Sequence, residues 1–258
     1  MQISAQIIPI RTRESTCNEC AFRAECLAKP AEDGDGGVGI EIPVIPRILH
    51  RGDHLFRTAE RFQNVYTVRS GAIKTYVILR SGEEQVIGFH TPGDIVALDA
   101  IESGRYVCNA VVLDTSCVCP LPYEQLCRLT ARSPEIQRRL VHKMSRRIVD
   151  HEGLLLILGQ KTAEQRMAAF LLHHSKKQRQ LGLSEVDINL PMSRADIASY
   201  LALAVETVSR VLTRLQEAGL LKVQRSRVRI LDLDGLAVVA EETMEDGPAQ
   251  RRGASALH

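Results

Sequence analysis

Residues 193–215 read SRADIASYLALAVETVSRVLTRL, a stretch with two short amphipathic runs joined at Ala202-Leu203-Ala204. Two short helices connected by such a tight turn are the pattern of a helix-turn-helix. Apolar residues recur at the spacing that would lock the two helices together. These residues are Ile197, Leu201, Val208, Val211, Leu212 and Leu215. The stretch therefore predicts a helix-turn-helix in the C-terminal part of the chain.

The polar side chains of the second run lie off this apolar stripe, and their types suit base reading. An arginine can fork onto guanine, a glutamate can accept from cytosine, and a serine can meet a base edge or a phosphate. Residues 222–230 read KVQRSRVRI, which predicts a basic hairpin that contacts phosphate as a wing. The alternative is a plain helical hairpin with a solvated polar face, but turn, core spacing and wing together favour DNA binding. The predicted DNA-binding residues are Glu206, Thr207, Ser209, Arg210 and Arg214.

Upstream, residues 51–104 consist of short apolar or alternating runs separated by glycine. The glycines fall at Gly52-Asp53, Ser70-Gly71, Ser81-Gly82, Pro92-Gly93-Asp94 and Ser103-Gly104, and after the first interval they recur every 11 residues. Strands with turns at such regular spacing are typical of a β-barrel or jelly roll.

A long amphipathic helix is predicted between these two regions. Ser133 and Pro134 suit the N-cap and first position, and apolar residues follow at steps of three and four to about residue 158. The helix would be about 39 Å long, and Gly159 is predicted to end it. Its stripe predicts either a dimer seam or packing on the chain's own β-domain. The seam residues are Ile136, Leu140, Met144, Ile148, His151, Leu155 and Leu158.

The first 45 residues lack periodicity but carry Cys17, Cys20 and Cys26 in a C-x2-C-x5-C cluster. Three thiolates in ten residues can hold one metal centre but leave a fourth ligand to be found. A zinc ribbon would show two close cysteine pairs, and this chain does not. The other four cysteines lie far downstream, and strand alternation cannot choose between Cys117 and Cys119, which face the same way.

Composition limits the class of protein. Of 258 residues, 45% are hydrophobic and 25% charged, as in ordinary globular proteins, and 33 basic against 31 acidic residues leave a net charge of +2. No run approaches the roughly 18 apolar residues of a spanning helix. Met1–Arg13 is too short in its apolar centre for a secretory signal, so we expect a cytoplasmic protein without a membrane contact. The motifs of common enzyme classes are absent, and we expect no enzyme.

Taken together, these motifs resemble the superfamily of the cyclic-AMP receptor and the fumarate-nitrate-reductase regulator (CRP/FNR), and within it the oxygen-sensing FNR regulators. The resemblance covers nearly the whole chain, from Cys17 to about Ala240. Besides the cysteine cluster, it rests on residues 70–74, 88–94, 99–101 and 205–210. It implies an α+β fold with an N-terminal β-roll like a cyclic-nucleotide-binding jelly roll, a long dimerisation helix and a C-terminal winged helix-turn-helix.

The predicted organisation has five parts. They are a cysteine-bearing arm and linker (1–45), a β-roll sensory domain (46–132), a dimerisation helix (133–159), a DNA-binding domain (160–240) and a flexible tail (241–258).

The resemblance also implies how the protein works. It chooses Cys119 as the fourth ligand, because the family's distal cysteine lies just before a Pro-aromatic-Glu-x-Leu segment, here residues 122–126. The metal ligands would then be Cys17, Cys20, Cys26 and Cys119, holding a [4Fe-4S] cluster. In the family the intact cluster favours a homodimer on palindromic promoter DNA resembling TTGAT-N4-ATCAA, and oxygen releases the DNA. The loop Ile78–Glu84 resembles the surface offered to RNA polymerase, although a plain hairpin turn explains it equally well.

The chain departs from the family at two places. Members that bind cyclic nucleotides carry a glutamate and an Arg-Ser pair where this chain has Leu98, Cys108 and Asn109, so we expect no cyclic AMP binding. His151 replaces a typical seam aspartate, whose repulsion keeps the cluster-free form monomeric. Two alternatives stay open: a regulator that senses nitric oxide or redox state, and a zinc-stabilised DNA-binding protein that does not respond to gas.

Overall fold

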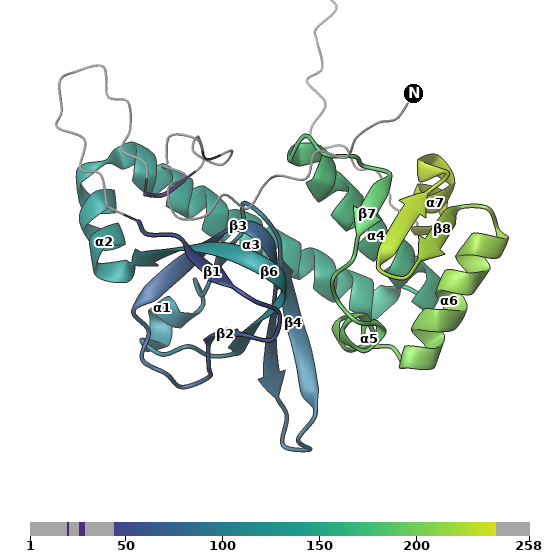
Figure 1. Cartoon of the computed structure of the whole chain (residues 1–258), viewed down its shortest axis with the longest axis horizontal. Helices are drawn as coiled ribbons and strands as arrows, with labels where there is room; N and C mark the ends of the chain where they lie inside the picture. Colours follow the sequence, from purple (N-terminus) through teal and green to yellow (C-terminus); the bar gives the residue numbers. More distant parts are fainter. Residues whose placement is uncertain (1–19, 21–25, 29–43, 241–258) are drawn as a thin grey trace, which may run out of the picture.

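The computed structural model describes Cys20, residues 26–28 and residues 44–240 (Figure 1). Most of the cysteine arm, including Cys17, and the tail from residue 241 lie outside the described residues. Among the described residues, no helix combines the length and the apolar composition that crossing a bilayer requires.

A six-stranded antiparallel sheet forms the first half of the described chain. Its strands are β1 (Arg47–Leu49), β2 (His54–Phe56), β3 (Asn64–Ile78), β4 (Glu84–His90), β5 (Ile95–Val96) and β6 (Asn109–Pro122), with α1 (Ala100–Ser103) before the last. The main path runs β1-β6-β3-β4, while β2 pairs with β6 and β5 with β3. Val68, Ile73 and Val118 are fully buried inside the curled sheet. The predicted β-roll is confirmed.

One of the predicted glycine turns is wrong. Gly52, Gly82, Gly93 and Gly104 have positive φ and lie in turns, but Ser70-Gly71 lies inside the long strand β3. There the pairing with β6 shifts register on both sides of Ser70, and a Cβ on Gly71 would come 2.2 Å from Ser116 Oγ. A bulge and a turn both place glycine at positive φ, so the composition of the segment did not separate them.

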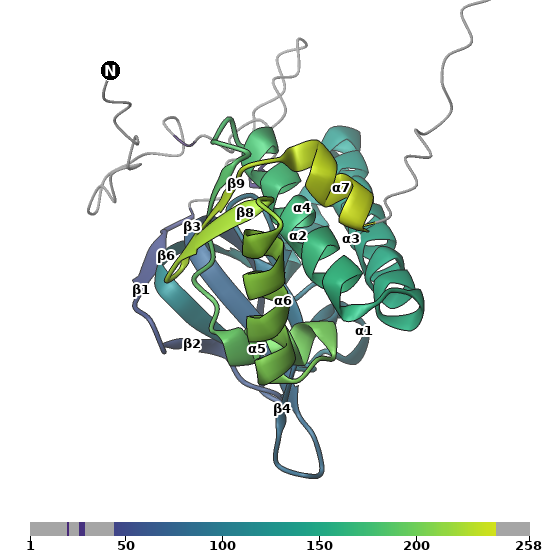
Figure 2. The ribbon, with the colours of Figure 1, turned by 90° about the vertical axis from the view of Figure 1, so that its right-hand side faces the viewer.

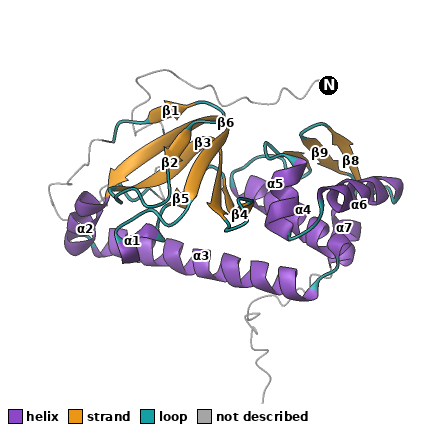
Figure 3. Ribbon diagram, turned by 90° about the horizontal axis from the view of Figure 1, so that it is seen from below, coloured by secondary structure: helices purple, strands orange, loops and turns teal. Residues whose placement is uncertain are grey.

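The long helix α3 (Pro134–Gln160) runs along the molecule below both the sheet and α4 (Figure 3). It begins as predicted, because the Ser133 side chain accepts a hydrogen bond from the Ile136 amide and Pro134 takes the first position. It continues one residue past Gly159, the predicted end. The helix α2 (Tyr123–Arg132), which precedes it, was not predicted.

The C-terminal part is a helical unit with a small sheet. Its elements are α4 (Ala163–Gln180), β7 (Asp187–Asn189), α5 (Arg194–Leu201), α6 (Val205–Glu217), β8 (Leu221–Gln224), β9 (Arg227–Ile230) and α7 (Leu233–Ala240). The sheet has the order β7-β9-β8, and the β8–β9 hairpin lies beside α6 (Figure 2). The predicted winged helix-turn-helix is confirmed, with β7 and α7 as elements that the sequence analysis missed.

Two apolar cores hold the chain together. The first fills the β-roll and takes in Leu27 of the arm and Ile136 of α3. The second lies under α4, α5 and α6 and takes in Ala72 and Leu113 from the sheet. Because the second core includes side chains of the sheet, the helix-turn-helix packs directly on the β-roll.

Candidate nucleic-acid interface and metal centre

The predicted base-reading side chains lie on the outer face of α6. The inner face is buried through Val208, Val211, Leu212 and Leu215. Outward lie Glu206, Ser209, Arg210 and Arg214, which are exposed, and Thr207, which is half-buried. The structure therefore presents all five predicted residues away from the core or at its border.

The local contacts of this face leave its charged groups available. Arg210 Nη2 lies 3.4 Å from Thr207 Oγ1, and Arg214 Nη1 lies 2.7 Å from Glu164 Oε1. Ion pairs as exposed as that of Arg214 contribute little to stability. A phosphate or a base edge can therefore replace Glu164 or Thr207 as the partner.

Two backbone features orient α6. Ser193 and Asp196 cap α5 reciprocally, each side chain bonding the other's amide. Ala202 then ends α5 in the left-handed conformation with φ 52°, which makes the turn tight. α6 therefore follows α5 at the angle that lets their shared apolar side chains pack.

The wing adds positive charge beside α6. Lys222, Arg225, Arg227 and Arg229 are all exposed on the β8–β9 hairpin. Among the residues that the structure describes, the carboxylate of Asp187 lies near one of them, 3.6 Å from Arg229 Nε. A basic hairpin next to a polar helix face is the arrangement that phosphate contact requires.

The candidate metal site lies on β6, where Cys117 and Cys119 are half-buried on either side of the fully buried Val118. Cys119 pairs with Thr67 of β3, and Cys117 pairs with Ile48 of β1. Burial, and after it the nearby thiols of Cys117, Cys26 and Cys20, raise the pKa of the Cys119 thiol to about 12. Burial also raises the pKa of Cys117, and of the two described arm cysteines Cys20 is the one that contributes there. Of the two arm thiols that the structure describes, both therefore act on Cys119.

The described piece of the arm is anchored next to this site. Leu27 is 1% exposed and belongs to the β-roll core. Arg139 Nη1 of α3 donates a hydrogen bond to the Cys26 carbonyl oxygen over 3.4 Å, and Arg139 also pairs with Glu135. The arm thus touches both the sheet and the first half of α3.

These residues fit an iron–sulfur cluster by their chemistry. Cys20, Cys26 and Cys119 supply three soft thiols, the ligand type that such clusters take, and Cys17 lies outside the described residues. No three metal-binding side chains within the described ranges are close enough to share a single ion.

α3 presents an apolar stripe to solvent. Leu155 is 69% exposed and Ile148 58%, and Met144 and His151 are exposed with them, while Leu158 is half-buried. Two members of the predicted seam lie elsewhere: Ile136 is fully buried in the β-roll core, and Leu140 packs against that core. The first turns of α3 pack on α2 and the sheet, which makes both residues part of the chain's own core.

Sequence analysis missed one residue of this stripe. Val141 is 59% exposed and stands three residues before Met144. The stripe then reads Val141, Met144, Ile148, His151, Leu155 and Leu158, at alternating steps of three and four. Such spacing is the signal of a helix-pairing seam, and it would have found Val141.

Comparison with known proteins places the chain in a family. A model of the Crp-like helix-turn-helix domain matches residues 165–239, and one of the cyclic nucleotide-binding domain matches residues 46–133. The transcriptional activator protein FnrA of Stutzerimonas stutzeri is 40% identical over 233 residues, covering 90% of this chain and 96% of the relative. The chain belongs to the CRP/FNR family of transcription regulators.

Further matches agree with this family. The fumarate and nitrate reduction regulatory protein of Escherichia coli K12 is 36% identical over 227 residues, covering 88% of this chain and 91% of the relative. The structure of FixK2 from Bradyrhizobium japonicum superposes with a TM-score of 0.69 at 28% identity, covering 77% of this chain and 98% of that one. This CRP/FNR regulator is of the FNR type and, as predicted, not an enzyme.

Three β-roll residues of this CRP/FNR regulator stand where the sequence analysis expected a cyclic-nucleotide-binding member to carry its ligand residues. Here they contribute to packing and to hydrogen bonds within the β-roll. Cys108 is buried with its thiol 3.9 Å from Asp99 Oδ2, and Asn109 Oδ1 accepts a hydrogen bond from the Thr58 amide. Leu98 packs against the β-roll core. None of these three side chains supplies the positive charge that a cyclic phosphate needs. That this chain does not bind cyclic AMP stays a prediction.

Proposed function

We propose that this CRP/FNR regulator responds to oxygen through a [4Fe-4S] cluster held by Cys17, Cys20, Cys26 and Cys119. With the cluster intact, the protein binds inverted-repeat promoter DNA as a homodimer. The observation that carries the proposal is the position of the arm: Cys26 packs against the β-roll core, and the thiols of Cys20 and Cys26 are near enough to Cys119 of β6, more than ninety residues along the chain, to raise its pKa.

The cluster, when bound, supplies an oxygen-labile link between the arm and the sheet. The chain's own residues transmit its state: Leu27 holds the arm in the β-roll core, and Arg139 holds the Cys26 carbonyl against α3. Loss of the link removes the covalent restraint on the arm and leaves noncovalent contacts such as these to hold it. The arm then populates other positions, and this changes the surface of α3 that a second copy of the chain would contact.

Dimerisation follows from the stripe Val141, Met144, Ile148, His151, Leu155 and Leu158. Paired helices of two copies would bury these side chains, and the two-fold axis along the seam would match that of an inverted repeat. We assign 133–159 to this role, 46–132 to the sensory domain and 160–240 to DNA binding, with 1–45 as the arm and 241–258 as a tail. Met144, Ile148, His151, Leu155 and Leu158 retain their predicted role, whereas Ile136 and Leu140 serve the core.

In the DNA complex, Glu206, Thr207, Ser209, Arg210 and Arg214 of α6 would enter the major groove of a site resembling TTGAT-N4-ATCAA. The wing would hold the flanking phosphates. The hairpin loop Ile78–Glu84 would contact RNA polymerase, because Ile78 and Leu79 are exposed there and belong to neither apolar core.

The test is purification without oxygen, followed by an absorption spectrum and by iron and acid-labile sulfide counts. We expect about four iron and four sulfide per chain and a visible band that bleaches in air. DNA binding measured before and after air should fall with the band. Zinc in a colourless protein would favour the constitutive alternative, and bleaching by nitric oxide but not by air would favour the nitric oxide sensor.

A further inference from the structure

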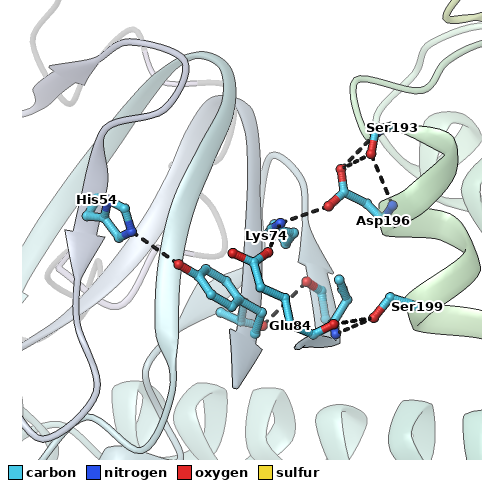
Figure 4. A network of polar contacts seen from close by, with 10 residues as sticks. His54, Lys74, Glu84, Ser193, Asp196 and Ser199 are labelled. Carbon is cyan, nitrogen blue, oxygen red and sulfur yellow. Dashed lines mark hydrogen bonds and ion pairs between the residues drawn. The ribbon is translucent and has the colours of Figure 1, made fainter. Parts of the chain in front are cut away.

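The helix α5 covers an open sheet edge. β4 ends the path β1-β6-β3-β4, and an edge strand leaves backbone groups without strand partners. Ser199 of α5 fills two of these places: its hydroxyl accepts from the Val86 amide at 2.8 Å and donates to the Glu84 carbonyl at 3.0 Å. Gln85 Nε2 in turn donates to the Ser199 carbonyl at 2.7 Å. α5 is thus bonded to β4 where a further strand would otherwise lie (Figure 4).

A buried lysine strengthens the same contact. Lys74 of β3 is only 8% exposed, and its Nζ lies 2.8 Å from both Glu84 Oε2 and Asp196 Oδ1 (Figure 4). Burial by itself lowers the pKa of Lys74, but the bonds to Asp196 and Glu84 outweigh it and raise the pKa overall. Asp196 also caps α5 through Ser193, so one carboxylate serves both the helix start and the contact with the sheet.

Two further contacts join the same two parts of the chain. Lys177 of α4 lies 2.7 Å from Asp94, which follows β4. The Phe89 ring lies 5.0 Å from the Tyr200 ring of α5 and 6.1 Å from that of Phe170 of α4. The docking of the helix-turn-helix on the β-roll therefore combines ion pairs, edge-strand hydrogen bonds and an aromatic cluster.

We propose that Lys74 and Ser199 are positioning residues for DNA binding: they dock α5 on the edge of β4 and thereby fix where α6 stands relative to α3. α6 is joined to α5 by a tight turn and a shared core, so it moves with α5. The reading face of α6 stays open in the docked arrangement, because the residues that dock lie on α4 and α5. The docked arrangement therefore leaves α6 free to enter a major groove.

The physical consequence concerns the dimer. Two recognition helices must lie about 34 Å apart to read successive major grooves. A helix-turn-helix that moves freely relative to α3 would be correctly placed for only a fraction of the time. The apparent affinity for DNA is then the intrinsic affinity multiplied by that fraction. This inference rests on DNA binding by the family but not on the cluster or on the proposed half-site.

The test compares the double variant Lys74→Met/Ser199→Ala with wild type, both purified without oxygen. The matched control is Lys176→Met/Ser103→Ala, which makes the same chemical changes at exposed positions of α4 and of α1. A third variant, Lys74→Arg, keeps the charge and both carboxylate partners. The probe is a DNA duplex selected by the wild-type protein from a random pool, so the result does not depend on the TTGAT prediction.

Two measurements are made on each variant. Hydrogen exchange without DNA should speed up by about tenfold in residues 84–90 and 194–201 of the double variant, since local opening becomes easier. The dissociation constant for the selected duplex should rise by about three- to tenfold with the same base preference. Lys74→Arg and the control should stay within about twofold of wild type on both counts.

Faster exchange without weaker DNA binding would overturn the positioning role, and so would tighter binding. Unchanged exchange would overturn the docking itself. Neither comparison between variant and wild type depends on the oxygen response or on the predicted half-site. The docking proposal and the proposed function can therefore fail separately.

Discussion

Arg139 on α3 donates a hydrogen bond to the carbonyl oxygen of Cys26, a residue that precedes it by 113 positions. The neighbouring Leu27 is buried in the β-roll core together with Ile136 of the same helix. The candidate metal site is therefore in contact with the helix that carries the exposed apolar stripe. A change in the arm can reach the proposed dimer seam through one hydrogen bond and one apolar contact.

Leu27→Ala should loosen the arm and speed the loss of the cluster in air. Truncating a buried leucine typically costs about 2–5 kcal/mol, and here the cost falls on the docking of the arm. The rate at which the visible band bleaches in air measures the effect. Leu79→Ala, at an exposed position of the hairpin, is the control and should bleach like wild type. Equal rates for both variants would show that Leu27 does not hold the arm.

Cys119→Ser should abolish the cluster in protein prepared without oxygen, whereas Cys117→Ser should retain it. Among the described arm cysteines, both Cys20 and Cys26 act on Cys119, whereas Cys20 is the one that acts on Cys117. Iron and sulfide counts decide the matter. Cys127→Ser on the exposed face of α2 serves as the control for a cysteine without such neighbours. Loss of iron in the Cys117 variant alone would show that Cys117, and not Cys119, is the fourth ligand.

His151→Leu should strengthen the seam and give dimers in air. A leucine at this position completes the apolar stripe between Ile148 and Leu155, whereas an imidazole must be desolvated to pair there. Sedimentation of the air-exposed protein measures the result. His142→Leu lies on the same helix next to the stripe, not in it, and should sediment like wild type. An air-exposed His151 variant that sediments as wild type would count against the seam.

Arg210→Ala and Lys222→Ala should weaken DNA binding in different ways. Arg210 would read a base, so its loss should cost about 1–3 kcal/mol and relax preference at one position. Lys222 of the wing would contact phosphate, so its loss should weaken all sequences alike and reduce the slope of log affinity against log salt by about one. Fluorescence anisotropy at several salt concentrations separates the two. A uniform loss for Arg210→Ala would remove it from base reading.

Stability should fall as the pH drops below about 6.5, the pKa of an unfolded histidine. Burial lowers the pKa of His90 and of His174 to about 3 in the folded chain. Between these values the unfolded chain binds protons that the folded chain does not, so each residue costs at most about 1.4 kcal/mol per pH unit. The contribution is complete above pH 6.5 and is lost on acidification.

The variant His174→Leu should lower that slope, by at most about 1.4 kcal/mol per pH unit. The ring of His174 packs against Phe170, and leucine keeps an apolar contact there. Guanidinium unfolding followed by circular dichroism between pH 7 and pH 5 measures the slope. His50→Leu, at an exposed position of the β1–β2 turn, should keep the wild-type slope. A variant at residue 174 with an unchanged slope would contradict the burial argument.

Local chemistry determined much of this protein from its sequence. The tight turn at Ala202, the cap at Ser133 and the left-handed glycines at 52, 82, 93 and 104 each depend on a few neighbouring residues, and the structure has them where the sequence placed them. The heptad-like spacing on α3 and the polar face of α6 likewise follow from helix geometry. The resemblance to a family came from these same local motifs.

Tertiary structure decided what depends on contacts between distant segments. It placed Gly71 in a bulge opposite Ser116, assigned Ile136 to the β-roll core, and surrounded Cys119 rather than Cys117 with both described arm thiols. It also brought Lys74 to Asp196, 122 positions apart. Periodicity reports which face of a segment is apolar but not which partner covers it, because the partner is chosen by the packing of the whole chain.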